Sequence, residues 1–168
     1  MKGKALQWLA QREHSRAELQ AKLLRHAAKA QSKAAQTAAA AAAEFPPEHD
    51  GPDEQADITR VLDELAAAGL QSDARAAASL ARTRCIRYGV HRLKQQLKAK
   101  GLDAELVAQT VAVARETEFE RAREIWRRRY GEPAQDQAQR ARQMRFLVSR
   151  GFDSDLVRRL VGGAADTD

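Results

Sequence analysis

The sequence predicts an all-α protein built from three tandem three-helix modules. About a fifth of the 168 residues are alanine, and leucine, arginine, glutamate and glutamine, which also favour helices, are abundant. Apolar residues recur every three or four positions, whereas β-branched and aromatic residues never alternate with polar ones over the length of a strand. The chain is also too short for a barrel of roughly 250 residues. These observations leave a β-sheet without support.

The first module is expected over residues 1–73. Ser15 and Glu18 have the order and spacing of a capping box, which predicts that the second helix of the module begins there. Gly69 is placed to end the third helix, because glycine readily adopts the left-handed conformation that closes many helices. The apolar positions of the three expected helices are Ala5, Leu6 and Leu9, then Leu19 and Leu23, then Ile58, Val61, Leu62 and Leu65.

An Ala- and Pro-rich excursion interrupts this module at about residues 27–53. Its first part favours a helix by its alanine content but lacks the large apolar residues that form a buried stripe. Its second part contains the Pro46-Pro47 and Gly51-Pro52 steps, which break regular structure. We expect a mobile segment here.

The remainder of the chain repeats one plan twice. In each copy a basic amphipathic helix ends at a glycine, Gly101 or Gly151, and the next helix begins behind an aspartate, Asp103 or Asp153, that can cap it. A further helix precedes each pair. The second module is expected over residues 74–116 and the third over residues 117–163. The apolar stripes of the second module are Ala77, Leu80, Ala81 and Cys85, then Val90, Leu93 and Leu97, then Leu106, Val107, Val111 and Ala114. Those of the third module are Phe119, Ala122, Trp126 and Tyr130, then Met144, Leu147 and Val148, then Leu156, Val157, Leu160 and Val161.

Modules of this size bury little surface alone, so we expect them to stack end to end into an elongated, curved array without sheet. Such an array offers its concave side to a partner. Residues 164–168 are expected to be a disordered tail, and the protein is expected to be a monomer. No apolar stretch approaches the roughly 18 residues that a membrane-spanning helix requires, so no membrane is expected among the partners.

No catalytic constellation is evident, and we expect neither an enzyme nor a bound cofactor or metal. Asp63 and Glu64 are adjacent on a helix, so their side chains diverge and favour a solvated face over acid–base catalysis. His14 and His91 have no nucleophile at a recognisable spacing. Cys85 lies on the apolar side of its helix, which favours a small buried role over reactivity, and a lone cysteine excludes an internal disulfide.

Phe146 has an unusual position for an aromatic residue. On a helical wheel it lies almost opposite the stripe of Met144, Leu147 and Val148. Two interpretations remain open: the ring packs against a neighbouring module, or it anchors a partner.

Basic residues gather in the second and third modules. The segment from Glu44 to Asp73 contains many acidic residues and a single basic one, Arg60, so the rest of the chain is more basic than the net charge of +6 suggests. The basic runs suit either phosphate groups or an acidic protein surface, because arginine binds both in a bidentate manner. The candidate binding residues are Arg84, Arg87, Arg92, Lys94, Lys98, Arg127, Arg128, Arg142, Arg145 and Arg150.

Several segments, in their order and spacing, resemble the RecX family of bacterial recombination regulators. These segments are residues 12–19 with Lys22 and Leu23, residues 61–65 with residues 69–75, residues 89–101, and Arg142 with Arg145-Phe146-Leu147 and Arg150-Gly151-Phe152. The resemblance implies tandem three-helix repeats and a cytoplasmic regulator, mainly an inhibitor, of the RecA recombinase. It also implies binding to the RecA–DNA filament, lower ATPase, strand-exchange and co-protease activity, and hence effects on DNA repair and the SOS response.

The alternative is a stand-alone basic helical protein that binds DNA directly. This alternative predicts DNA affinity that falls steeply with salt in the absence of RecA. The regulator hypothesis predicts effects on the filament at concentrations too low for binding to free DNA.

Overall fold

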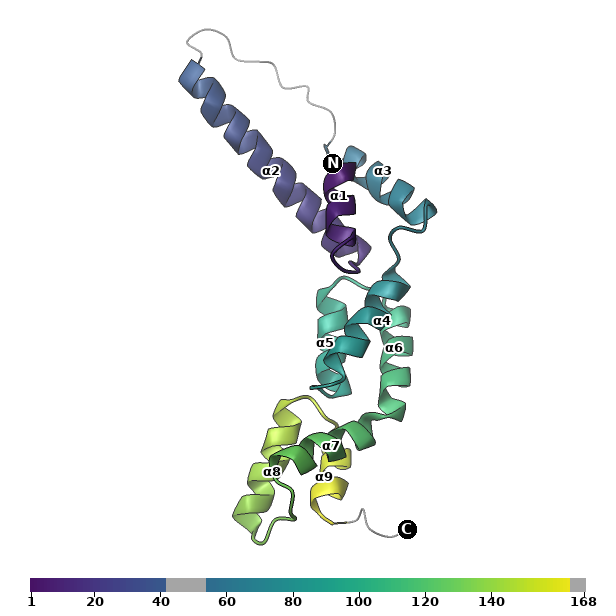
Figure 1. Cartoon of the computed structure of the whole chain (residues 1–168), viewed down its shortest axis with the longest axis vertical. Helices are drawn as coiled ribbons and strands as arrows, with labels where there is room; N and C mark the ends of the chain where they lie inside the picture. Colours follow the sequence, from purple (N-terminus) through teal and green to yellow (C-terminus); the bar gives the residue numbers. More distant parts are fainter. Residues whose placement is uncertain (42–53, 164–168) are drawn as a thin grey trace. The chain divides into compact units, whose positions relative to one another are not determined.

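A computed structural model describes residues 1–41 and 54–163, which contain nine α-helices and no strand (Figure 1). The prediction of an all-α protein is confirmed. No helix among these residues is long and apolar enough to cross a membrane. The chain divides into two compact units, residues 1–76 and 77–168. The helices are α1 (Lys2–Leu9), α2 (Arg16–Ala41), α3 (Glu54–Ala67), α4 (Asp73–Arg84), α5 (Val90–Ala99), α6 (Ala104–Glu116), α7 (Glu118–Arg129), α8 (Gln137–Ser149) and α9 (Ser154–Val161).

In the first unit, α1, α2 and α3 bury one apolar cluster. Its members are Ala5, Leu19, Leu23, Ile58, Leu62 and Leu65, which the sequence placed on the expected stripes. The capping box is confirmed: the Glu18 amide donates to Ser15 Oγ at 3.1 Å, and the Ser15 amide donates to Glu18 Oε2 at 3.4 Å. Gly69 follows α3 with a φ of 68°, as its expected role requires. Local sequence signals therefore set the start of α2 and the end of α3.

Helix α2 continues through the first part of the excursion to Ala41, where the alanine content favoured a helix, and Ala27 itself is buried. High alanine propensity sustains a helix even without a continuing apolar stripe. Residues 42–53, which include both proline steps, and the expected tail at 164–168 lie outside the described residues.

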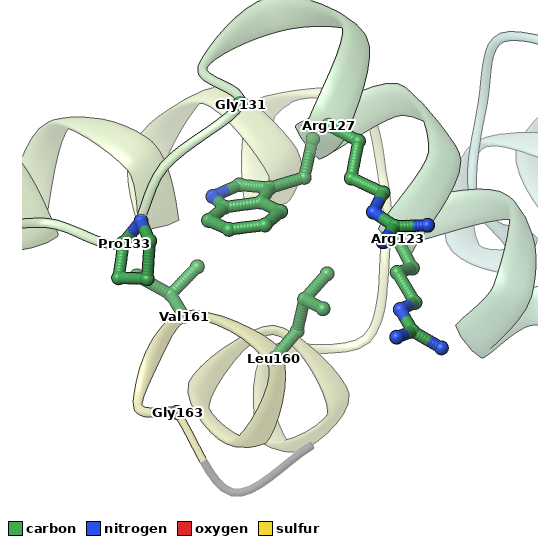
Figure 2. A pocket seen from close by; sticks show the side chains of 8 residues that line it. Arg123, Arg127, Gly131, Pro133, Leu160, Val161 and Gly163 are labelled. Atoms are coloured by element: carbon green, nitrogen blue, oxygen red, sulfur yellow. The ribbon is translucent and has the colours of Figure 1, made fainter. Parts of the chain in front are cut away.

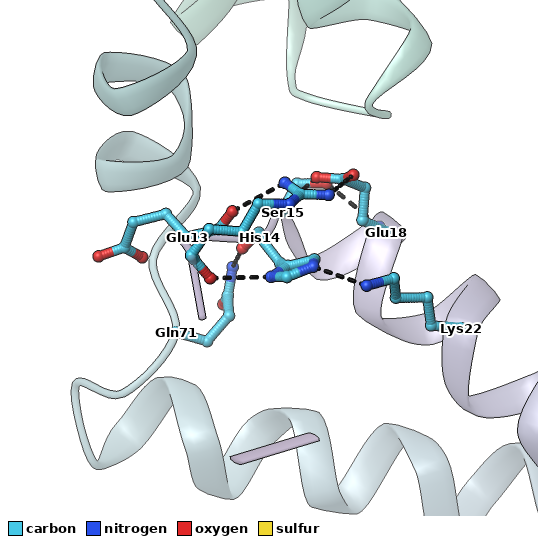
Figure 3. A network of polar contacts seen from close by, with 7 residues as sticks. Glu13, His14, Ser15, Glu18, Lys22 and Gln71 are labelled. Atoms are coloured by element: carbon cyan, nitrogen blue, oxygen red, sulfur yellow. Dashed lines mark hydrogen bonds and ion pairs between the residues drawn. The ribbon is translucent and has the colours of Figure 1, made fainter. Parts of the chain in front are cut away.

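A polar network around His14 fixes the turn between α1 and α2 (Figure 3). His14 Nδ1 lies 2.9 Å from the Arg12 carbonyl oxygen, and Nε2 lies 2.8 Å from Lys22 Nζ. Because a carbonyl only accepts and an ammonium only donates, the ring is neutral with its proton on Nδ1. Gln71 Nε2 donates to the His14 carbonyl oxygen at 3.4 Å and so ties the turn to the segment that follows α3.

Burial lowers the pKa of His14 below its ordinary value of 6.5. The unfolded chain therefore binds this proton more readily than the folded chain, and the free energy of unfolding should fall as the pH drops below 6.5. We expect urea unfolding of the first unit, followed by Trp8 fluorescence in a Trp126→Phe background, to show this loss between about pH 7.5 and 5.5. His14→Gln should flatten the dependence. His26→Gln alters an exposed histidine of the same unit, and an equal flattening there would contradict the assignment.

The second unit contains two successive three-helix cores. The first core lies among α4, α5 and α6 around Leu93, Leu97 and Val107, and we call these helices the second module. The other core lies among α7, α8 and α9 around Leu147, Phe152 and Val157, and we call these helices the third module. Both glycines that end the fifth and eighth helices have positive φ, and both aspartates accept two backbone amides at the starts of α6 and α9. The predicted caps are confirmed.

Helix α8 matches the expected stripe only in part: Leu147 is buried and Met144 packs against the core of the module, as expected. Gln143 and Leu147 are buried and Phe146 and Arg150 are half-buried, so the inward face follows positions i, i+3, i+4 and i+7 from Gln143. Val148, expected in the core, is exposed. Phe146 packs within its own module, where its ring meets that of Tyr130 edge-on at 5.5 Å between centroids. Packing against a neighbouring module was therefore the wrong expectation for this ring.

Candidate functional site

The start of helix α5 is capped by the third module. Three consecutive backbone amides at this end have no side-chain cap of their own. The Gly89 amide donates to the Arg150 carbonyl at 3.0 Å, and the His91 amide donates to the Gly151 carbonyl at 3.0 Å. Between them, the Val90 amide donates to Oε1 of the buried Glu118 at 2.9 Å. The amides that a helix leaves unpaired at its start are thus satisfied across the contact between modules.

Two glycines allow this close contact. A Cβ atom on Gly89 would lie 2.3 Å from the Gly151 carbonyl oxygen. A Cβ atom on Gly151 would lie 2.7 Å from both the amide nitrogen and the Cβ of Arg92. Side chains at either position would push the backbones apart and break the amide bonds to α5. We call the contact formed by Gly89, Glu118 and Gly151 the module joint.

Arg121 closes the same joint from the other side. Its Nη1 donates to the carbonyls of Cys85 at 2.9 Å and Tyr88 at 3.0 Å, and its Nη2 donates to the Ala114 carbonyl at 2.6 Å. One guanidinium group therefore satisfies carbonyls behind α4 and at the end of α6. Cys85 packs against the core of the second module, and burial raises the pKa of its thiol, which supports the small apolar role expected for it.

Sequence reasoning missed both Glu118 and Arg121. Glu118, Ala122 and Trp126 are spaced by four residues on one helical face, so a glutamate stands at a position of the buried stripe. A charged residue at such a position predicts a buried partner. That signal was available for Glu118, whereas Arg121 lies outside the stripe and gave none.

The ten candidate binding residues lie on the second unit, and all except the half-buried Arg150 are exposed. Arg84 ends α4 and Arg87 lies in the turn that follows, while Arg92, Lys94 and Lys98 lie on α5. Arg127 and Arg128 lie in the last turn of α7, Arg142 and Arg145 lie on α8, and Arg150 follows α8. Exposure leaves these cations available to a partner.

The module joint brings three of these arginines together. Arg150 Nη1 donates to the Arg87 carbonyl at 3.4 Å, and the backbone of Arg92 lies against Gly151. The Arg92 guanidinium lies 4.8 Å from the ring centroid of Tyr88, and that of Arg150 lies 4.4 Å from the ring of Phe146. Stacking on a ring holds a guanidinium without using up its N–H donors. The guanidinium groups of Arg92 and Arg150 are therefore held by rings of their own modules, and Arg87 contributes an exposed cation beside them.

Asp153 lies beside His91, the residue before Arg92 in the sequence, and it is already engaged. It accepts the amides of Asp155 and Leu156 at the start of α9, and its Oδ2 lies 3.5 Å from His91 Nε2. The backbone hydrogen bond from Leu156 is the largest influence that lowers the pKa of Asp153. The described residues hold no group of three or more His, Cys, Asp or Glu side chains that suits a metal ion.

The module joint does not include Arg127 and Arg128, the two candidate binding residues at the end of α7, and the surroundings of these two side chains differ. Arg128 is paired with Glu124 one turn earlier. Arg127 instead lines a pocket of about 180 Å³ on the third module, beside Arg123 (Figure 2). Leu160 and Val161 of α9 and Pro133 of the following loop form other walls, together with Trp126.

Gly89→Ala should destabilise the second unit by about 1–3 kcal/mol or more, because the added methyl group collides with backbone atoms that cannot move aside. Urea unfolding followed by Trp126 fluorescence in a Trp8→Phe background measures this cost. Gly3→Ala is the control, since nothing lies within 4 Å of a Cβ there, and because Gly3 lies in the first unit the variant should leave the unfolding of the second unit unchanged. Equal stability of the two variants would disprove the close contact.

Comparisons with known proteins agree with this architecture. The family model of the second three-helix domain of RecX matches residues 72–111, and that of the third three-helix domain of RecX matches residues 116–161. The regulatory protein RecX of Leptothrix cholodnii is 44% identical over 161 residues, which cover 96% of this chain and 87% of that protein. The regulatory protein RecX of Ralstonia nicotianae is 36% identical over 164 residues, which cover 98% and 87%.

Among solved structures, RecX from Lactobacillus salivarius shares the fold, with a TM-score of 0.69 at 18% identity over 96% of this chain and 92% of that one. A second RecX crystal structure has a TM-score of 0.63 at 19% identity. The repeated three-helix cores, the matched domains and the identity across nearly the whole chain together place this protein in the RecX family of regulatory proteins.

Proposed function

We propose that this protein regulates the RecA recombinase by binding the RecA–DNA filament in the cytoplasm through the basic side chains of its second and third modules. Membership of a family of regulatory proteins supports this role. The observation that carries the binding mode is the set of Arg87, Arg92 and Arg150 held together at the module joint. Binding lowers the ATPase, strand-exchange and co-protease activities of RecA, and so limits recombination, DNA repair and the SOS response.

The proposed mechanism is binding without catalysis. Guanidinium groups that are held in place lose little conformational freedom when they meet a carboxylate or a phosphate. Because these groups come from two modules, several weak contacts add through a high effective concentration once the first has formed. A monomer is sufficient for this mechanism. Once bound, this protein inhibits RecA by holding RecA protomers in place or by displacing them from the filament.

The test is ATP hydrolysis by RecA on single-stranded DNA, with this protein added in substoichiometric amounts. We expect hydrolysis to slow when far fewer than one molecule of this protein is present per RecA protomer, because one molecule bound to a filament affects several neighbouring protomers. Binding to the same DNA without RecA is measured in the same buffer. Unchanged hydrolysis together with salt-sensitive binding to free DNA would favour the alternative, a DNA-binding protein that acts alone.

The double charge reversal Arg92→Glu with Arg145→Glu should weaken filament binding by at least about tenfold, since each substitution replaces attraction by repulsion. Co-sedimentation with RecA filaments measures the binding, and circular dichroism verifies that helicity is retained. Both residues are exposed, so the fold should tolerate the change.

A matched control separates local contact from overall charge. Arg25→Glu with Lys29→Glu, on exposed positions of α2, lowers the formal net charge of +6 by the same four units. This control should bind filaments nearly as well as the wild type. Full binding and inhibition by the Arg92 and Arg145 variant would reject the proposed basic surface.

A further inference from the structure

We propose that the pocket of the third module holds one large apolar side chain from an acidic segment of a partner protein. The inference rests on the proposed function, in which that partner is RecA in its filament. It assigns different roles to Arg127, which lines the pocket, and Arg128, which does not. The two residues are adjacent in the sequence and equally basic, so their sequence context does not distinguish them.

The pocket combines apolar side chains with two arginines, and several of the apolar residues are held in place. Leu160 and Val161 are buried at the end of α9, and Pro133 contributes a ring with little freedom. Trp126 is held in orientation because its Nε1 donates to Oε1 of the buried Gln143 at 2.8 Å. The volume of about 180 Å³ is similar to that of cavities of about 150 Å³ that hold benzene. Because the pocket is open on one side, this volume is enough for one leucine or phenylalanine side chain to enter from a partner.

The charges at the pocket select an acidic partner. Arg123 and Arg127 extend from α7 along one side of it (Figure 2), and none of the described lining residues is acidic. Within the described part of the chain Arg127 has no hydrogen bond or ion pair, whereas Arg128 is paired with Glu124. A carboxylate next to the inserted side chain would meet the guanidinium of Arg127 at low cost, because no existing pair has to break.

The chemistry of the walls favours a protein over a nucleic acid. A nucleobase carries hydrogen-bonding groups on its edges, and Pro133, Leu160 and Val161 have no side-chain donor or acceptor to meet them. The indole N–H of Trp126 is already used by Gln143. The guanidinium groups of Arg123 and Arg127 could donate to a base, but no lining side chain could accept from the N–H groups of a base, whereas an aliphatic or phenyl side chain has no polar group to satisfy.

The decisive comparison is Arg127→Glu against Arg128→Glu, two variants with the same net charge at adjacent positions. We expect Arg127→Glu to raise the concentration for half-inhibition of RecA ATP hydrolysis by about tenfold or more, as for the loss of an anchoring contact. Arg128→Glu removes one exposed cation of the proposed binding surface, but this cation is already paired with Glu124, so the variant should raise the same concentration by a clearly smaller factor of about threefold. Equal effects of the two variants, or no effect of Arg127→Glu, would overturn the inference.

A photo-crosslink identifies the occupant. Pro133 is exposed at the pocket, so p-benzoylphenylalanine placed there reaches whatever enters it, while the same group at exposed Ala112 of α6 is the control. A crosslink to RecA from position 133, absent from position 112 and lost with Arg127→Glu, supports the inference. A crosslink to DNA or within this chain, or none from position 133, overturns it.

These outcomes are distinct from failure of the proposed function. If the wild type leaves RecA hydrolysis unchanged, the regulatory proposal itself fails. If the wild type inhibits and the two charge reversals behave alike, only the pocket inference fails, and the basic surface at the module joint remains the proposed contact.

Discussion

The second unit depends on the capping of three amides at the start of α5 by the turn that follows α8 and by Glu118 of α7. The acceptors for these amides come from the third module, so the second module is completed only when its neighbour is in place. Burying those amides unpaired would cost a substantial part of the stability of a small domain. Glycines at both sides of the contact let the backbones come close enough for the bonds to form. The two modules thus behave as one folded unit.

This dependence explains how exposed arginines become a surface of defined geometry. Long basic side chains on separate helices normally sample many arrangements and lose that freedom when they bind. Here Arg92 follows the capped amides and Arg150 supplies one of the acceptors, so the joint that stabilises the fold also sets the spacing of the cations. Tyr88 and Phe146 then limit the orientation of the two guanidinium groups. Stability and recognition share the same residues.

The sequence was sufficient for features that depend on local spacing. The capping box at Ser15, the aspartates before α6 and α9, and the glycines with positive φ all act within a few residues of their own helix. The module joint joins residues that are 28 to 63 positions apart, and no local pattern specifies which distant carbonyl an amide will meet. The buried face of α8 was predicted only in part for a related reason. Gln143 and Arg150 occupy that face because Trp126 and Phe146 provide partners for them, and polarity alone suggests the opposite.

The module joint also bears on how this protein can be altered. Two of its three acceptors are main-chain carbonyls, which any residue provides, so the contact imposes side-chain identity at few positions beyond Gly89, Glu118 and Gly151. The outward positions of α5, α7 and α8 are then open to exchange without loosening the scaffold. Libraries that vary those positions while keeping the module joint would offer a route to proteins that bind a chosen target. The joint would hold the varied surfaces of the two modules at a constant distance from each other.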